Sequence, residues 1–323
     1  MSRSMRIRRM QRNDDAAVGK RPAARAMSEM RARMRAALLL ALWPLAASAA
    51  WARISVQDDA GHTVTLPAPA RRIISLAPHA TELLYAAGAG DKLVAVGKFS
   101  DYPPPAQQLP LVGDSAALDL ERIVALKPDL VLVWGSGNSV SQIAKLHSLG
   151  LNIFESEPRD FATIASSLER LARLAGSDAS GAAAAANFRA RLQRITHLYQ
   201  QRAPVRVFYQ IWPEPLMTLN DEHMVSAAIR LCGGENIFGK LPRLAPTVGI
   251  EAVLQADPEV IIAGSSARDD SLDAWRRFPK LTAVARNNLF TLDSNTMTRA
   301  GPRILDGTDA LCQHLDAARR KRK

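Results

Sequence analysis

The chain has 323 residues, enough for two domains of ordinary size, and its 47% hydrophobic content excludes a disordered protein. Its formal net charge of +11 would suit a nucleic-acid or membrane partner, but residues 1–52 hold +8 of it. The remainder carries only about +3, so the charge gives little support for nucleic-acid binding.

The N-terminal charge belongs to a pattern typical of a secretory signal peptide. Basic residues at 30–35 (MRARMR) precede an apolar run at 36–47 (AALLLALWPLAA), and small residues follow, so that cleavage would come after Ala49 or Ala52. The run is too short for a membrane span, and an apolar core helix is the alternative. We therefore predict an N-terminal extension and signal peptide over residues 1–52.

The two cysteines, Cys232 and Cys312, lie far beyond the cleavage region, so no cysteine is placed there to carry a lipid anchor. An exported protein without an anchor is retained by an outer membrane, which predicts a periplasmic location. A pair of cysteines in an oxidising compartment predicts one disulfide, with two buried free thiols as the alternative.

Residues 54–66 alternate between apolar and polar side chains and turn at Ala60–Gly61, which predicts a β-hairpin. From Arg72 onward short apolar runs alternate with helical stretches, as in a parallel sheet covered on both faces. In chain order we predict a strand at 73–77, a helix at 81–87, a strand at 93–96, a proline-rich loop at 102–105, a helix at 120–126, strands at 130–134 and 153–155 with a helix at 139–149 between them, a helix at 161–174, and further elements at 205–211, 224–231, 250–256, 260–263, 289–292 and 304–318.

Residues 179–202 are rich in strong helix formers and have no helix breaker after Gly181. At about 1.5 Å per residue, such a helix would span roughly the width of a domain. We predict a connecting helix over 178–203, ended by Pro204, between an N-terminal lobe (53–177) and a C-terminal lobe (204–323).

An internal repeat at a constant offset of 130 supports two related lobes. Residues 120–134 (LERIVALKPDLVLVW) match residues 250–264 (IEAVLQADPEVIIAG), with Glu121 opposite Glu251. Each copy is a short amphipathic helix, an acid-flanked proline and a buried strand. Two similar lobes facing each other predict a cleft for a small ligand.

The sequence contains none of the common catalytic patterns, such as H-E-x-x-H, G-x-S-x-G, a P-loop or C-x-x-C. Its six histidines are scattered. We predict a binding protein and not an enzyme; a periplasmic metalloenzyme is the alternative of another class, and it would carry bound metal and turn over a substrate.

Four segments closely resemble the periplasmic cobalamin-binding proteins of vitamin importers, a branch of the ABC-importer substrate-binding family that also includes siderophore and haem binders. The likeness covers most of residues 53–319 and includes both cysteines. It implies an α/β fold of class III, with two Rossmann-like lobes joined by a single long α-helix. The segments are 72–84 (RIISLAPHATELL), 100–104 (SDYPP), 120–132 (LERIVALKPDLVL) and 232–238 (CGGENIF).

The resemblance also implies the partners. Cobalamin or a related corrinoid would be a transported ligand and not a cofactor, bound between the lobes of a free monomer, with no role for nucleic acid. The loaded protein would dock on an inner-membrane permease dimer powered by a cytoplasmic ATPase. Glu121 and Glu251, one per lobe, would meet arginines of the permease. A glutamate in a first helical turn is also favourable for the helix dipole, and the two roles are compatible.

The resemblance places the ligand among loops at the carboxyl ends of the strands, where open α/β sheets bind ligands. Two positions that carry tryptophan in the best-known member are Ser115 and Ala245 here, a tyrosine is replaced by Phe99 and a phenylalanine by Met217. This less aromatic pocket leaves another corrinoid, haem or a ferric siderophore open. The implied ligand-binding residues are His79, Phe99, Ser115, Trp134, Trp212, Met217, Ala245, Met297, Thr298, Arg299, Ala300 and Gly301.

Three kinds of contact are expected from these residues. Trp134 and Trp212 would stack on a corrin ring, unless they are ordinary core residues. His79 opens a helix facing the cleft and could coordinate the metal of the bound chelate; a polar histidine at a helix start is the alternative. Arg299 would bind an amide or a carboxylate of the ligand, or be a surface cation.

Overall fold

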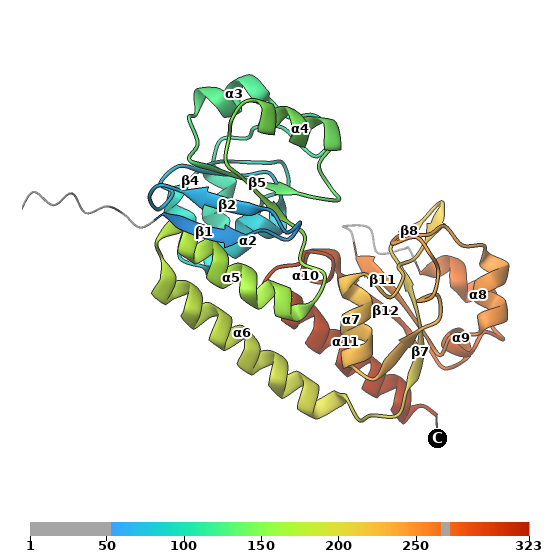
Figure 1. Ribbon diagram of the computed structural model, residues 1–323. Coiled ribbons are helices and arrows are strands. Elements are labelled where there is room, and N and C mark those ends of the chain that lie inside the picture. The colour runs from blue at the N-terminus through green and yellow to red at the C-terminus, as the bar shows by residue number, and fades with distance from the viewer. Residues whose placement is uncertain (1–52, 266–271, 323) are drawn as a thin grey trace, which may run out of the picture. The chain divides into compact units, whose positions relative to one another are not determined.

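The structure is a computed structural model that describes residues 53–265 and 272–322 (Figure 1). The predicted signal peptide lies outside the described residues. The strands are β1 (Ile54–Gln57), β2 (Thr63–Leu66), β3 (Ile73–Ser75), β4 (Leu93–Val96), β5 (Leu130–Trp134), β6 (Ile153–Ser156), β7 (Val205–Gln210), β8 (Trp212–Pro213), β9 (Leu216–Met217), β10 (Gly234–Asn236), β11 (Val260–Ser265) and β12 (Leu289–Asp293). The helices are α2 (Pro78–Ala86), α3 (Leu120–Ala125), α4 (Val140–Ser148), α5 (Phe161–Ala175), α6 (Asp178–Tyr199), α7 (Met224–Leu231), α8 (Ile250–Ala256), α9 (Thr282–Ala285), α10 (Ser294–Met297) and α11 (Ile304–Arg320), with 3₁₀ turns at Gly90–Lys92, Pro104–Gln108 and Asp273–Arg277.

Two four-stranded parallel sheets organise these elements. The first sheet has the order β4-β3-β5-β6 and, with α2 to α5, forms lobe 1; the second has the order β10-β7-β11-β12 and, with α7 to α11, forms lobe 2 (Figure 1). In chain order the central strand of each lobe comes first, and the chain then adds strands on either side of it. The predicted hairpin of β1 and β2 is confirmed as an antiparallel pair.

Each sheet is buried on both faces because its strands alternate between two cores. In β5, Leu130 and Leu132 pack on the α2 and α5 side, whereas Val131 and Val133 pack with residues of α3 and α4. In lobe 2 the α7 and α11 side includes Val260, and the α8 and α9 side lies on the opposite face. This is why the sequences of β5 and β11 begin as continuous apolar runs.

The two lobes share the same hydrogen bonds at the start of their central strands. The Asp129 carboxylate accepts the backbone N–H of Arg72 at 2.9 Å, and the Glu259 carboxylate accepts that of Arg206 at 3.3 Å. The guanidinium of each arginine donates to a backbone carbonyl at the end of the short helix, α3 or α8. The repeat predicted from the sequence is therefore confirmed as a repeated structural unit.

Helix α6 is the predicted long helix, and it runs beside α5 (Figure 1). A side chain at Gly181 would collide with Ala172 of α5, so glycine allows the two helices to approach closely. Phe188 and Ile195 of α6 belong to the same hydrophobic core as the inner faces of both lobes. The exact domain boundaries at 177 and 203 stay predictions.

A disulfide joins Cys232, at the end of α7, to Cys312 in α11, as predicted. It crosses 80 residues of chain within lobe 2 and lies in the buried core. Several short elements were not predicted, namely β8, β9, β10, α9 and α10. None is long enough to show a helical period, and the three strands lack a run of four apolar residues like that of β4. Helix α2 begins at Pro78, three residues before the predicted start, since proline suits the first turn of a helix.

Candidate functional site

A cavity of about 300 Å³ lies between the two lobes. Its walls come from the carboxyl ends of β5, β6 and β7 and from the starts of α2 and α7, which is where open α/β sheets bind ligands. Its volume is at the lower end of the range for small-molecule pockets. The lining residues are His79, Trp134, Ser136, Glu157, Pro158, Arg159, Ile211, Leu219, Glu222, His223, Met224, Leu244, Ala245, Thr298 and Ala300.

Trp134 ends β5 and forms the aromatic part of the lobe 1 wall. Its backbone N–H donates to the Asn138 side-chain oxygen at 2.7 Å, which closes a tight turn. A Cβ at Gly137 would collide with the indole, so glycine leaves room for the ring. The rings of His79 and Trp134 meet edge to face, with centroids 5.6 Å apart and planes at 76°. Trp134 is therefore held by its neighbours before any ligand arrives.

His79 lies at the start of α2 and is 4% exposed. Its Nε2 is 3.0 Å from the Ser156 hydroxyl oxygen at the end of β6. Burial lowers the pKa of His79 to about 4, and the nearby charge of Arg299 adds to this, although the hydrogen bond with Ser156 acts in the opposite direction. The imidazole is therefore neutral at physiological pH, with one nitrogen already engaged.

His223 occupies the corresponding place in lobe 2, directly before α7. Its Nδ1 accepts the backbone N–H of Val225 at 3.1 Å and so caps the helix. Burial lowers the pKa of His223 to about 4. Because Nδ1 is an acceptor, the neutral ring carries its proton on Nε2. This makes His223 a hydrogen-bond donor in the cavity wall.

The charged groups of the cavity are mainly acidic. Glu157 accepts the backbone N–H of Ser136 at 2.7 Å, and Glu222 stands opposite, in the lobe 2 wall. Among the described residues that line the cavity, Arg159 is the one Lys or Arg side chain. With both histidines neutral, the wall holds two carboxylates and one guanidinium.

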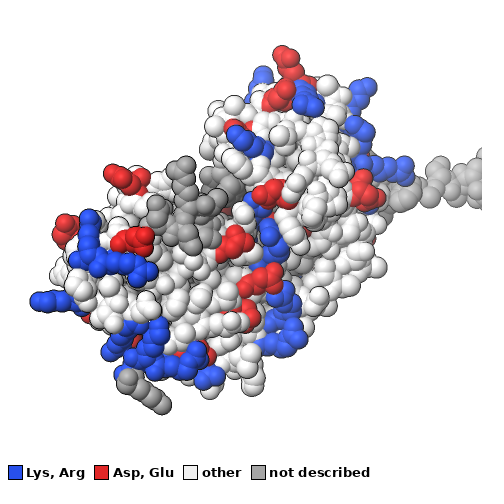
Figure 2. Space-filling model, turned by 180° about the vertical axis from the view of Figure 1, so that it is seen from behind, with Lys and Arg blue, Asp and Glu red and all other residues white. Residues whose placement is uncertain are grey.

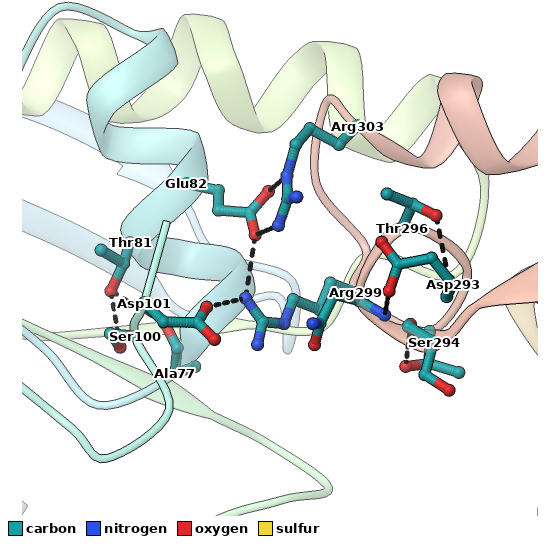
Figure 3. Close-up of polar contacts among 12 residues, drawn as sticks. Ala77, Thr81, Glu82, Ser100, Asp101, Asp293, Ser294, Thr296, Arg299 and Arg303 are labelled. Carbon is teal, nitrogen blue, oxygen red and sulfur yellow. Dashed lines mark hydrogen bonds and ion pairs between the residues drawn. The ribbon is translucent and has the colours of Figure 1, made fainter. Parts of the chain in front are cut away.

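A cluster of ion pairs lies next to the cavity and joins the lobes (Figure 3). Arg303 donates to both oxygens of Glu82, with distances of 2.9 and 2.6 Å, and Arg299 reaches Glu82 at 3.2 Å and Asp101 at 2.5 Å. The hydrogen bond from Arg299 is the main cause that lowers the pKa of Asp101, and the bond to Glu82 raises the pKa of Arg303. The guanidinium of Arg303 also stacks 3.8 Å from the ring centroid of Tyr102.

The structure brings five of the twelve predicted ligand-binding residues together in the cavity wall: His79, Trp134, Ala245, Thr298 and Ala300. The other seven lie outside that wall. Phe99 and Trp212 are 64% and 59% exposed, Ser115 is exposed, Met217 is half-buried, and Met297 and Gly301 are buried. Arg299 is tied to Glu82 and Asp101.

The sequence analysis did not single out ten of the lining residues. The signal that could have found Ser136, Glu157, Pro158 and Arg159 was their place shortly after a predicted strand, and Ile211 ends one. Histidine is an uncommon helix cap, so His223 carried no local signal.

Glu121 and Glu251 are exposed and lie in the first turns of α3 and α8. Within residues 53–265 and 272–322, neither carboxylate has an ion-pair partner. Across the same residues, no His, Cys, Asp and Glu side chains group in threes as a metal site would need, and no helix is long and apolar enough to cross a bilayer. On the face turned toward the viewer in Figure 2, acidic and basic side chains are interspersed.

Sequence comparison finds relatives along most of the chain. A family model described as "Periplasmic binding protein" matches residues 73–296. A vitamin B12-binding protein of Vibrio cholerae serotype O1 is 41% identical over 256 residues, which are 79% of this chain and 92% of that protein. A vitamin B12-binding protein of Yersinia pestis, strain Pestoides F, is 39% identical over 278 residues, which are 85% of this chain and 95% of that protein.

Structure comparison agrees. The periplasmic vitamin B12-binding protein BtuF of Vibrio cholerae has a TM-score of 0.73 at 41% identity, covering 78% of this chain and 98% of that one. The haem-binding protein RhuT from Roseiflexus sp. RS-1 has a TM-score of 0.68 at 22% identity, with 77% and 98% covered, and shows a shared fold alone. These relatives are binding proteins, and they confirm the predicted two-lobe α/β fold. The chain therefore belongs to the periplasmic binding protein family.

Proposed function

We propose that the chain is the periplasmic substrate-binding protein of an ABC importer. It captures cobalamin or a related corrinoid between its lobes and delivers it to an inner-membrane permease. The observation that carries this proposal is the inter-lobe cavity with Trp134 in its wall, in a chain 41% identical to a vitamin B12-binding protein. A corrinoid is larger than the enclosed volume, so part of it would extend beyond the cavity toward the surface.

The charges of the cavity favour a corrinoid over haem. A corrin ring carries neutral amide side chains, whereas haem carries two propionates that need cations. Arg159 is the one described cation in the wall, and it is accompanied by Glu157 and Glu222. Arg299 and Arg303 are already paired with Glu82. Amide groups can pair with both carboxylates and imidazole, so the wall suits an uncharged, amide-rich ligand.

Haem is the second candidate because two histidines line the cavity. An axial ligand must offer a free ring nitrogen to iron. Nε2 of His79 already bonds Ser156, and Nδ1 of His223 already accepts Val225. His223 would have to give up its bond with Val225 before Nε2 could bind a metal, whereas His79 could keep its contact with Ser156 and offer Nδ1. The engagement of His223 and the scarcity of cations in the wall support the corrinoid as first choice.

A direct test is titration of the mature protein with cyanocobalamin, haemin and a ferric siderophore, followed by tryptophan fluorescence and calorimetry. We expect saturable one-to-one binding of cyanocobalamin. Trp134→Ala should weaken binding by at least about fivefold, because an aromatic contact contributes about 1 kcal/mol beyond its buried area. Trp212→Ala is the matched variant, since its ring is exposed and outside the cavity wall, and should change affinity less. Tight binding of haemin without binding of cyanocobalamin would contradict the corrinoid assignment.

Docking on the permease is proposed for Glu121 and Glu251. Their support is the equivalent, exposed position that each holds in its own lobe, at the start of α3 and α8 (Figure 1). A double substitution Glu121→Ala and Glu251→Ala should lower import at least about tenfold, because interfacial charges control complex formation, while ligand affinity stays unchanged. Glu235→Ala, at another exposed glutamate of lobe 2, is the control. Unchanged import by the folded double variant would rule the docking role out.

Export through the pattern at residues 30–52 completes the proposal. If a signal peptidase removes this segment, protein recovered from the periplasm will begin after Ala49 or Ala52. Mass spectrometry of that N-terminus decides between the two cleavage sites, and recovery of the uncleaved chain would contradict both.

A further inference from the structure

A buried carboxylate of lobe 1 forms ion pairs with two arginines of lobe 2. The Glu82 side chain on α2 is 2% exposed, yet its partners Arg299 and Arg303 come from the segment between α10 and α11 (Figure 3). Arg303 donates a hydrogen bond to each carboxylate oxygen of Glu82. Two-point contacts of this kind fix orientation as well as distance. The ion pairs therefore hold the relative placement of the two lobes at this point.

The same arginines hold a second segment of lobe 1, the loop that follows β4. Arg299 pairs with Asp101, and Arg303 stacks on the ring of Tyr102. Ser100, beside them, lies within hydrogen-bond distance of Thr81 on α2. This loop begins at Phe99, whose φ of 69° is unusual for a residue with a side chain and needs support from its surroundings.

We infer that Glu82, Asp101, Arg299 and Arg303 form an inter-lobe latch that positions the ligand site. This inference rests on the proposed function only for the identity of the ligand. Arg299 and Arg303 act as positioning residues: they hold the walls of the cavity in place through Glu82 and Asp101. Arg299 was expected to contact the ligand, and the latch gives it a different role.

The latch is next to cavity walls on both sides. Thr298 and Ala300, the neighbours of Arg299, line the cavity from lobe 2. His79 lines it from lobe 1 and lies three residues before Glu82 on α2, on the same side of the helix. Loosening the ion pairs would therefore let both walls move relative to each other.

The expected consequence for binding is a loss of preorganisation. If only a fraction of molecules keeps the walls in place, the apparent dissociation constant rises by the inverse of that fraction. Removing Arg303 also leaves the buried Glu82 with Arg299 as its one remaining arginine among the described residues, so the remaining groups would rearrange. A latch predicts both effects in the free protein and not only in the complex.

Amide hydrogen exchange of the ligand-free protein separates the latch from a ligand contact. The amides of Lys98, Ser100 and Asp101 are hydrogen-bonded and report on the loop. In Arg303→Met we expect their exchange to accelerate about tenfold, while amides of the interior strand β5 keep their rates. Arg189→Met is the matched control, because it removes an arginine from an equally short two-point pair with Glu169, away from the cavity.

Affinity for cyanocobalamin, measured on the same variants, supplies the second arm. Arg303→Met should bind about tenfold more weakly, with Arg189→Met unchanged. Glu82→Gln, which keeps the shape of the side chain, should show the same loop exchange to a smaller degree. Unaltered loop exchange in Arg303→Met and Glu82→Gln would overturn the latch, and so would acceleration spread equally over β5. The exchange arm needs no ligand, so it stands even if cyanocobalamin proves to be the wrong one.

Discussion

The two lobes have the same strand order and the same hydrogen bonds at the start of their central strands, but they differ in what joins and braces the strands. Lobe 1 passes from β3 almost directly into α2, whereas lobe 2 inserts the β8–β9 hairpin between β7 and α7. Lobe 2 is braced by the Cys232–Cys312 disulfide. Lobe 1 is braced by close packing of α5 against α6, which Gly181 permits.

This difference separates two tasks. The shared arginine and acid lie at the start of the strands and fix the sheet, and neither lines the cavity. The cavity is built from the segments that differ, such as Glu157–Arg159 in lobe 1 and Glu222–Met224 in lobe 2. The repeat therefore provides two scaffolds, and the loops on their carboxyl edges provide a site with two unlike walls.

Removing the disulfide should produce the largest difference in stability between the two lobes, because it lies in lobe 2. Replacing Cys232 and Cys312 together by Ser releases a loop of 80 residues, which costs about 4–5 kcal/mol on the chain-entropy model. Urea unfolding of the double variant measures the loss. Hydrogen exchange should place most of it in α7 and α11, with the lobe 1 strands less affected. A loss below about 1 kcal/mol would mean that packing alone braces lobe 2.

Smaller for each residue is the dependence of stability on pH, to which one buried histidine of each lobe should contribute. His79 and His223 have an ordinary pKa of 6.5 that burial lowers to about 4, so below pH 6.5 the unfolded chain binds protons that the folded chain does not. Their contribution is fully present above pH 6.5 and is lost as pH falls toward 4, by about 3 kcal/mol for each histidine. Urea unfolding between pH 7.5 and roughly pH 4 measures this slope.

Matched variants divide that slope between the lobes. His79→Gln keeps a hydrogen-bond partner for Ser156, and His223→Asn keeps a helix cap. Each should remove a similar part of the slope, and the rest comes from other groups whose pKa is lowered, such as His314 and Asp101. If one variant removed all of it, the two histidines would not be equivalent in burial.

The equivalent acids Asp129 and Glu259 should differ by a smaller amount. Asp129 accepts the backbone N–H of Arg71 and Arg72, while Glu259 also bonds Arg322 near the C-terminus. Glu259→Ala should therefore cost about 2 kcal/mol and Asp129→Ala about 1 kcal/mol, measured by urea unfolding. Asp129→Asn and Glu259→Gln retain acceptors and serve as controls. A greater loss in Asp129→Ala would show that the contact with Arg322 adds nothing.

Much of this fold could be predicted because its strands and helices have strong periods. The predicted strands at 93–96 and 130–134 match β4 and β5 to the residue, and the repeat at offset 130 proved to be structural. The hairpin β8–β9 could not be predicted, since each of its strands has only two residues, too few to show an alternation.

The residues of the cavity wall were predicted less completely than the fold, and Trp134 and Trp212 show why, although the ligand contacts of both stay predictions. Sequence likeness gave both the same role, but only Trp134 ends a central strand and is directed by Gly137 and Asn138 into the cavity wall. Arg299 meets Glu82 across 217 residues of chain, a contact that no local pattern can indicate. Pairings between lobes depend on tertiary packing, which lies beyond the reach of a single sequence.

The smallest expected effect gives the sharpest comparison, because two equivalent residues should respond with opposite signs. Lys127 and Asp257 both follow the short helix of their lobe with positive φ, 47° and 39°. Glycine adopts this backbone without strain, so Lys127→Gly should stabilise the protein by about 0.5–1 kcal/mol. Asp257 also accepts hydrogen bonds from the backbone N–H and the hydroxyl of Thr282 at the start of α9, which glycine would remove. Asp257→Gly should therefore destabilise by a similar amount, since the lost cap outweighs the relief of strain.

Thermal unfolding resolves such shifts, and Asp257→Asn, which tolerates this backbone and keeps an acceptor, should stay near wild type. Stabilisation by both glycine variants would mean that the bonds to Thr282 contribute little and that the two helix ends are alike in energy as well as in shape.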